Sequence, residues 1–244
     1  MTSFSVNLNK IALLRNSRPK DFPSLEEAAL LAIRCGCDGL TIHPRADERH
    51  ARLVDIDRLA AICKAAPRKI ELNIEGNCRA ELMARARAAG VDQFTLVPAD
   101  PGELTSTRGW HPEKDDMNAV RAAATELRAH MRVSLFIEPD VTQVRLAQEL
   151  GVDCVEIYTG SYVEALASGD EPPILERIVA AAKQARTAGL RVHLGHDLDL
   201  ANLPMLLRAV KPDEVSIGHA IAAEAVLIGL EARLPLYVRA CHEA

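Results

Sequence analysis

Residues 79–98 read RAELMARARAAGVDQFTLVP and join a helical pattern to a strand pattern across one glycine. The alanine-rich run Arg79–Ala89 predicts a helix, and the short run Gln93–Pro98, with its β-branched side chains, predicts a strand. Gly90 between them can adopt the left-handed conformation that ends a helix at little steric cost. The stretch therefore predicts a unit of helix, glycine stop and strand.

The same unit recurs along the chain, because Gly36 and Gly151 also stand between a helical run and an extended run. Eight strands are predicted at Phe4–Asn9, Gly39–His43, Lys69–Glu75, Gln93–Pro98, Arg132–Glu138, Cys154–Thr159, Arg191–His196 and Glu214–His219. Eight helices are predicted at Leu25–Cys35, Ile56–Ala65, Arg79–Ala89, Met117–His130, Val141–Leu150, Ile174–Ala188, Leu200–Val210 and Ile221–Ala240.

Eight alternating units predict an α/β protein with the (β/α)8 or TIM-barrel fold, which typically takes about 250 residues. The chain has 244 residues, and no linker or change of composition divides it, so we expect a single domain over residues 1–244. An open, doubly wound sheet is the alternative. It is less favoured because no Gly-rich phosphate-binding turn follows the first predicted strand.

The composition excludes several classes of protein. Hydrophobic residues make up 48% of the chain, which can build a sizeable core, yet no uninterrupted apolar run reaches the length of a membrane span. The N-terminal residues carry no secretion signal, so a cytoplasmic protein with six free thiols is expected. The net charge is −5 and no basic stretch stands out, which argues against a nucleic-acid partner.

The longest loop after a strand, residues 99–116, follows the fourth predicted strand. It contains Thr105 and the only tryptophan of the chain, Trp110. Long loops at the catalytic end of a barrel often close over the substrate. The sequence therefore predicts a lid after strand four.

Polar side chains gather where the predicted strands end, and this is the end at which barrels carry their chemistry. Three of them, His43, Glu75 and His196, are groups that accept or donate protons. No serine or cysteine stands in a nucleophile elbow beside them, so serine-hydrolase chemistry is disfavoured. The pattern indicates general acid–base catalysis.

Two features predict phosphate binding. Cationic side chains cluster near the first two strand ends, at Arg15, Arg18, Arg45, Arg49 and His50. The last strand runs through Gly218 and His219 into a helix, whose N-terminal amides attract anions. Two separate anion sites predict a substrate with two phosphates, or two phosphorylated substrates.

A catalytic metal is a weaker interpretation. His43, Glu138, Glu156 and His196 could ring a divalent ion, as in sugar-isomerase barrels. The first strand, however, offers Asn7 and Asn9 where such barrels have a pair of histidines. We therefore expect neither a metal nor another cofactor.

These motifs, in this order and spacing, resemble the pyridoxine 5'-phosphate synthase family of the deoxyxylulose-dependent vitamin B6 route. The resemblance covers essentially the whole chain. It is carried by VNLNKIA at 6–12, LRNSR at 14–18, TIHPR at 41–45, DERH at 47–50, LNIE at 72–75, LVP at 96–98, VSLFI at 133–137, EIYTG at 156–160, GHD at 195–197 and SIGHA at 216–220.

The resemblance implies a barrel that condenses 3-amino-2-oxopropyl phosphate with 1-deoxy-D-xylulose 5-phosphate, giving pyridoxine 5'-phosphate, phosphate and water without a redox cofactor. By position, His43 and Glu75 resemble the proton acceptors of the family, and His196 resembles its proton donor. Residues at the amino-ketone phosphate site would be Asn7, Arg18, Asp197, Gly218 and His219. Residues at the deoxyxylulose phosphate site would be Asn9, Lys10, Arg45, His50 and Thr105. The family also implies a homo-octamer in which a neighbouring subunit contributes the arginine at position 18.

The chain departs from the family pattern at two places. Many members have Asp-His where this chain has Asn9-Lys10, so a negative charge is missing there. Position 197 is often glycine, and Asp197 places a carboxylate close to a phosphate site. Two alternatives therefore stay open, a metal-dependent sugar-phosphate isomerase or epimerase and a non-catalytic barrel that binds phosphorylated ligands.

Overall fold

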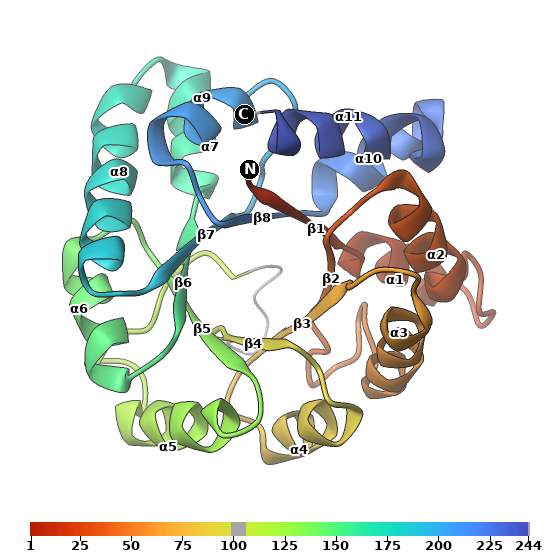
Figure 1. Cartoon of the computed structure of the whole chain (residues 1–244), viewed down its shortest axis with the longest axis horizontal. Helices are drawn as coiled ribbons and strands as arrows, with labels where there is room; N and C mark the ends of the chain where they lie inside the picture. Colours follow the sequence, from red (N-terminus) through yellow and green to blue (C-terminus); the bar gives the residue numbers. More distant parts are fainter. Residues whose placement is uncertain (99–105, 244) are drawn as a thin grey trace.

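A computed structural model describes residues 1–98 and 106–243 of the chain. Within them, eight parallel strands pair in sequence order, and β8 returns to β1 to close a barrel. The strands are β1 Ser3–Asn7, β2 Gly39–Ile42, β3 Glu71–Gly76, β4 Gln93–Leu96, β5 Arg132–Ile137, β6 Cys154–Tyr158, β7 Arg191–Gly195 and β8 Glu214–Ile217. The predicted (β/α)8 barrel is confirmed, and the doubly wound alternative is wrong (Figure 1).

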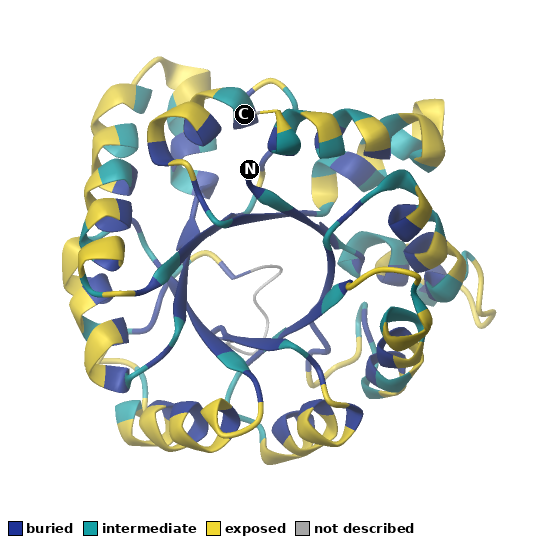
Figure 2. Cartoon of the chain, viewed as in Figure 1, coloured by how far each residue is buried: buried dark blue, intermediate teal, exposed yellow. Residues whose placement is uncertain are grey.

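Helices surround the barrel and cover the outside of the strands (Figure 1). In the described parts of the chain they are α1 Asn9–Asn16, α2 Leu25–Cys35, α3 Leu53–Ala65, α4 Ala80–Ala89, α5 Met117–Arg128, α6 Val141–Leu150, α7 Gly160–Ser168, α8 Glu171–Thr187, α9 Leu203–Val210, α10 His219–Ile228 and α11 Leu230–His242. Their inner faces and the strands are buried, and their outer faces are exposed (Figure 2).

The repeated glycine stops have the predicted conformation. Gly36, Gly90 and Gly151 end α2, α4 and α6 with φ of 103°, 65° and 70°. Because side chains rarely adopt these angles, glycine is the favoured residue at each of these helix ends.

An aspartate just before every second strand fixes the strand register. Asp92, before β4, donates its backbone N–H to the Leu72 carbonyl at 3.1 Å, and its carboxylate accepts the Leu72 N–H at 3.0 Å. The same reciprocal pair of hydrogen bonds recurs at Asp38 with Phe4, Asp153 with Val133 and Asp213 with Val192. These bonds tie the amino-terminal ends of neighbouring strands together and leave the carboxyl ends open for the site.

The observed elements differ from the predicted ones at several boundaries. The first strand ends at Asn7 rather than Asn9, because the Asn7 side chain accepts the Asn9 N–H at 3.0 Å and α1 begins there. The short helix α7 occupies residues that the sequence left between strand six and its helix. The last helix is two helices, since Gly229 interrupts it with φ of 85°.

The two ends of the chain meet on one side of the barrel, where α11 lies beside β1 (Figure 1). The Thr2 N–H donates to the Cys241 carbonyl at 3.3 Å, and the rings of Phe4 and Tyr237 stack with centroids 6.0 Å apart. This packing covers the barrel where its first and last units meet.

The predicted lid is only partly within the described residues, and Thr105 lies outside them. Trp110, in the described part of the loop, is buried, and its indole N–H donates to the Leu96 carbonyl at 3.0 Å. This bond anchors the loop to the end of β4. A lid over the site stays a prediction.

Candidate active site

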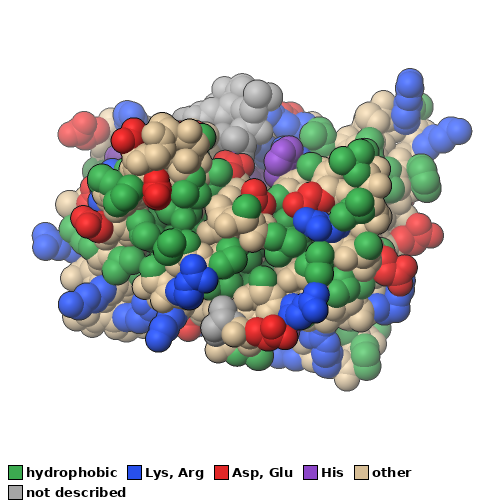
Figure 3. Space-filling view, turned by 90° about the horizontal axis from the view of Figure 1, so that it is seen from above, with side chains coloured by type: hydrophobic (Ala, Val, Ile, Leu, Met, Phe, Trp, Pro, Cys, Tyr) green, Lys and Arg blue, Asp and Glu red, His purple; other side chains and the backbone are tan. Residues whose placement is uncertain are grey.

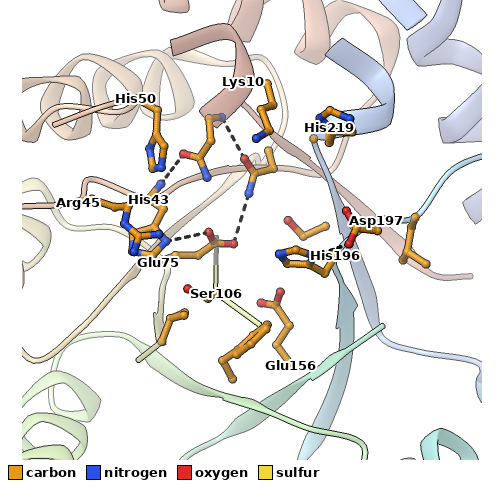
Figure 4. A pocket seen from close by; sticks show the side chains of 17 residues that line it. Lys10, His43, Arg45, His50, Glu75, Ser106, Glu156, His196, Asp197 and His219 are labelled. Carbon is orange, nitrogen blue, oxygen red and sulfur yellow. Dashed lines mark hydrogen bonds and ion pairs between the residues drawn. The ribbon is translucent and has the colours of Figure 1, made fainter. Parts of the chain in front are cut away.

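A cavity of about 300 Å³ opens at the carboxyl ends of the strands (Figure 4). It is lined by Asn7, Asn9, Lys10, His43, Arg45, His50, Glu75, Val97, Ser106, Phe136, Glu156, His196, Asp197, Leu198, Ser216, Gly218 and His219. Every predicted catalytic residue is in this set, and so is every predicted substrate-binding residue within the described residues except Arg18.

Glu75, near the end of β3, lies at the centre of the cavity. Its Oε2 is 3.7 Å from Nδ1 of His43, and its Oε1 accepts a hydrogen bond from Nδ2 of Asn7 at 3.4 Å. Burial raises the pKa of Glu75 to about 7, opposed by the charge of His196 and by hydrogen bonds from Asn7 and Asn9. Near neutral pH this carboxyl group can therefore either accept or release a proton.

His43 follows β2 and is almost inaccessible to solvent. Its backbone N–H donates to Oδ1 of Asn9 at 2.7 Å, which fixes the start of the loop after the strand. Burial, together with the nearby His50 and Arg45, holds the pKa of His43 well below its usual value. His43 is therefore neutral near pH 7 and can act as a proton acceptor.

His196 follows β7 on the opposite side of the cavity (Figure 4). Its Nδ1 is 2.9 Å from Oδ2 of Asp197, and the ring meets Tyr158 edge to face with centroids 5.0 Å apart. The Thr159 hydroxyl donates to the His196 carbonyl at 2.5 Å. These contacts fix both the backbone and the ring of His196.

Glu156, which the sequence offered only as a possible metal ligand, is a candidate functional residue of the cavity. It lies in β6, is only 5% exposed and lines the cavity beside Gly195. Burial and the charge of Glu75 raise the pKa of Glu156 well above its usual value. A signal was present, because Glu156 is the single charged residue in the apolar strand CVEIY.

The rim on the side of β1 and β2 carries cationic and neutral donors. Arg45 is buried, Lys10 projects from α1, and burial, with Arg45 and Lys10, lowers the pKa of His50 to about 4. Within the described residues, Nδ1 of His50 and Oγ of Ser216 are buried without a hydrogen-bond partner. Buried polar atoms of this kind are normally satisfied, so both are available to a bound ligand.

Gly218 follows β8 and lies at the rim of the cavity opposite the cationic one. It allows the chain to pass close to β1. A Cβ at this position would lie 2.7 Å from the Asn7 carbonyl oxygen, closer than carbon and oxygen can approach. His219 begins α10 directly afterwards, so the N-terminus of this helix lies at the cavity. This arrangement suits an anionic group.

Two residues considered from the sequence lie away from the cavity. Arg18 lies on the exposed turn after α1 and does not line the cavity of its own chain. Glu138 is 3.5 Å from Nε2 of His111 instead of facing His43 or His196. Among the residues that the structure describes, no group of three or more His, Cys, Asp and Glu side chains is placed to hold a metal ion.

A closed barrel with buried proton-transfer groups at the carboxyl ends of its strands defines a (β/α)8-barrel enzyme of the acid–base type. Comparison with known families identifies the enzyme family. Residues 4–243 match the family described as pyridoxal phosphate biosynthesis protein PdxJ, and the chain belongs to this family.

Curated relatives agree. A pyridoxine 5'-phosphate synthase of Albidiferax ferrireducens is 41% identical, with 98% of this chain and 96% of the relative covered. A pyridoxine 5'-phosphate synthase of Cytophaga hutchinsonii is 42% identical over 98% of both chains. Among solved structures, phosphoribosyl anthranilate isomerase of Thermotoga maritima is similar with a TM-score of 0.64 at 10% identity, with both chains fully covered. That likeness concerns the fold alone.

Proposed function

We propose that the chain acts as a pyridoxine 5'-phosphate synthase that condenses 3-amino-2-oxopropyl phosphate with 1-deoxy-D-xylulose 5-phosphate. The products are pyridoxine 5'-phosphate, phosphate and water. The proposal is carried by one observation, the joining of His43, Glu75 and His196 in a single cavity within a chain of this family.

The reaction needs repeated proton transfers and no strong nucleophile. The amine of one substrate attacks the ketone of the other and loses water to form an imine. Loss of phosphate and an aldol-type ring closure follow, and a second water leaves as the ring becomes aromatic. Neutral His43 and the carboxyl group of Glu75 act as proton acceptors, and His196 acts as the proton donor.

Each of the two substrates binds with its phosphate at one rim of the cavity. The deoxyxylulose phosphate lies against Asn9, Lys10, Arg45 and His50, where cationic side chains surround its phosphate. The amino-ketone phosphate lies near Asn7, Gly218 and His219, with its phosphate at the start of α10. The buried carboxyl group of Glu156, which burial keeps protonated, donates a hydrogen bond to an oxygen of the reacting intermediate.

The test is a two-substrate assay with purified protein. We expect release of phosphate and a pyridoxine-like absorbance only when both substrates are present. His43→Ala, Glu75→Gln and His196→Ala should each lower the rate by about 100-fold or more while leaving the circular dichroism spectrum unchanged. Activity that disappears on chelation would instead favour a metal-dependent isomerase, and tight binding of both substrates without product would favour a binding protein.

We also propose that the chain, as one domain, assembles into a cytoplasmic homo-octamer in which Arg18 serves a neighbouring subunit. The exposed turn that carries Arg18, and the exposed apolar side chains Leu14, Val226 and Leu227 on α1 and α10, support an assembly. Mixing Arg18→Ala subunits with His43→Ala subunits tests it. If the arginine acts across the interface, mixed assemblies recover activity that neither variant has alone, whereas an arginine that serves its own chain gives no recovery.

No helix in the described part of the chain has the length and apolar character needed to cross a membrane.

On the face drawn in Figure 3, Lys and Arg side chains are interspersed with Asp and Glu. A long polyanion such as a nucleic acid binds an extended basic surface, and this face has none. Its mixture of charges is better suited to small anionic substrates that bind at the cationic rim of the cavity.

A further inference from the structure

Two consecutive residues at the end of β7 have backbone angles that side chains rarely adopt. His196 has φ of 94° and Asp197 has φ of 57°. Glycine would relieve this conformation, and aspartate tolerates it better than most residues do. Backbone strain of this kind persists where the surrounding structure enforces it, and it concentrates at functional sites.

The unusual turn brings the Asp197 carboxylate to the side of the His196 ring that faces away from the cavity centre (Figure 4). Oδ2 of Asp197 lies 2.9 Å from Nδ1 of His196. The edge of the ring also contacts Tyr158, so the imidazole cannot turn freely. The other ring nitrogen, Nε2, is thereby directed toward Glu75 and the cavity.

Several other charged or titratable groups face this pair, and they come from four elements. They are Lys10 from α1, Glu75 from β3, Glu156 and Tyr158 from β6, and His219 from α10. The hydrogen bond to His196, and the charges of His196, His219 and Lys10, lower the pKa of Asp197. Asp197 is therefore ionised near neutral pH, and the positive charge of Lys10 acts on it and offsets its repulsion of a nearby phosphate.

We propose that Asp197 is a positioning residue that forms an Asp–His pair with His196 and presents Nε2 as the proton-donating atom. This inference rests on the proposed synthase function and assigns Asp197 a role different from the predicted one of substrate ligand. The carboxylate accepts the Nδ1–H and stabilises the imidazolium. When Nε2 gives its proton to the substrate, the remaining proton stays on Nδ1. Nε2 is then unprotonated and takes up a new proton from water.

Two variants of Asp197 separate positioning from substrate binding. Asp197→Gly suits the positive φ and removes the acceptor, and Asp197→Asn keeps the shape and removes the charge. Glu164→Gln is the matched control, because it removes an exposed carboxylate from the neighbouring helix α7 without touching His196. For both Asp197 variants we expect kcat to fall about tenfold and KM for each substrate to stay within about twofold.

The second measurement is the tautomer of His196, followed by NMR of protein labelled with ¹⁵N-histidine. In the wild-type protein and in Glu164→Gln, the neutral ring should carry its proton on Nδ1, and both Asp197 variants should lose this preference. An unchanged tautomer in Asp197→Gly, or a raised KM with an unchanged kcat, would overturn the pairing. If the wild-type protein makes no product but its tautomer depends on Asp197, the pairing stands and the synthase function fails.

Discussion

Oε2 of Glu75 lies 3.7 Å from Nδ1 of His43, and their side chains are only 12% and 8% exposed. Burial moves their pKa values in opposite directions, up for the carboxyl group and down for the imidazole. Near pH 7 His43 is consequently neutral and Glu75 is about half ionised, so the two groups form no fixed ion pair and both can accept a proton.

The raised pKa of Glu75 predicts an acid limb in the dependence of kcat/KM on pH. The pKa of Glu75 is raised to about 7, so the carboxylate needed as acceptor is lost as the pH falls through that value. We expect kcat/KM to drop about tenfold for each pH unit below the limb. Glu75→Gln should remove nearly all activity, and Glu75→Asp should retain the limb at a lower rate. A rate that is constant from pH 5 to pH 8 would contradict this assignment.

Glu156 should act as a neutral hydrogen-bond donor. Because burial and Glu75 keep its pKa well above the usual value, the group that faces the cavity is the acid and not the carboxylate. Glu156→Gln retains a donor of similar shape and should lower kcat by less than about tenfold, whereas Glu156→Ala should lower it about 100-fold. Steady-state kinetics of both variants check this, and equal losses in the two would show that the proton itself is transferred.

The fully buried Arg15 should be essential for stability. Its guanidinium holds Asp55 through two hydrogen bonds of 2.8 and 2.9 Å and also donates to the His50 carbonyl at 3.1 Å. Arg15→Met leaves the Asp55 carboxylate buried without its partner and should lower the free energy of unfolding by about 3–5 kcal/mol. Urea denaturation measures this.

The double variant Arg15→Met/Asp55→Asn is the control for that loss. It should recover part of the stability, because the unpaired charge is then gone. Additive losses from the two substitutions would mean that Arg15 and Asp55 do not act as a pair.

Glu214 should make the fold less stable as the pH rises. Burial, and then the charge of Glu71, raise the pKa of Glu214 to about 7 from an ordinary 4.5. Between those two values the folded protein holds a proton that the unfolded chain has lost, so the free energy of unfolding decreases with increasing pH. Glu214→Gln should therefore be more stable than the wild type at pH 8, by about 2 kcal/mol, and equally stable at pH 4. A stability difference that does not change between these pH values would contradict the shift.

The sequence alone determined the barrel and most of its site. Periodic alanine-rich runs and glycine stops such as Gly90 are local signals, so each unit could be recognised without knowing its neighbours. The closing of eight such units then brings their strand ends together, which is why His43, Glu75 and His196 could be predicted to meet although they are far apart in the chain.

Other features were decided only by the tertiary structure. Asp92 can hold the strand register only because the backbone N–H of Leu72 lies opposite its carboxylate in the folded chain. Arg15 looked like a phosphate-binding cation, but it is buried with Asp55, and the contact of Asp197 with His196 could not be seen in the sequence. The sequence shows which residues can carry a charge. The role of each one is determined by its burial and by its distance to partners in the folded chain.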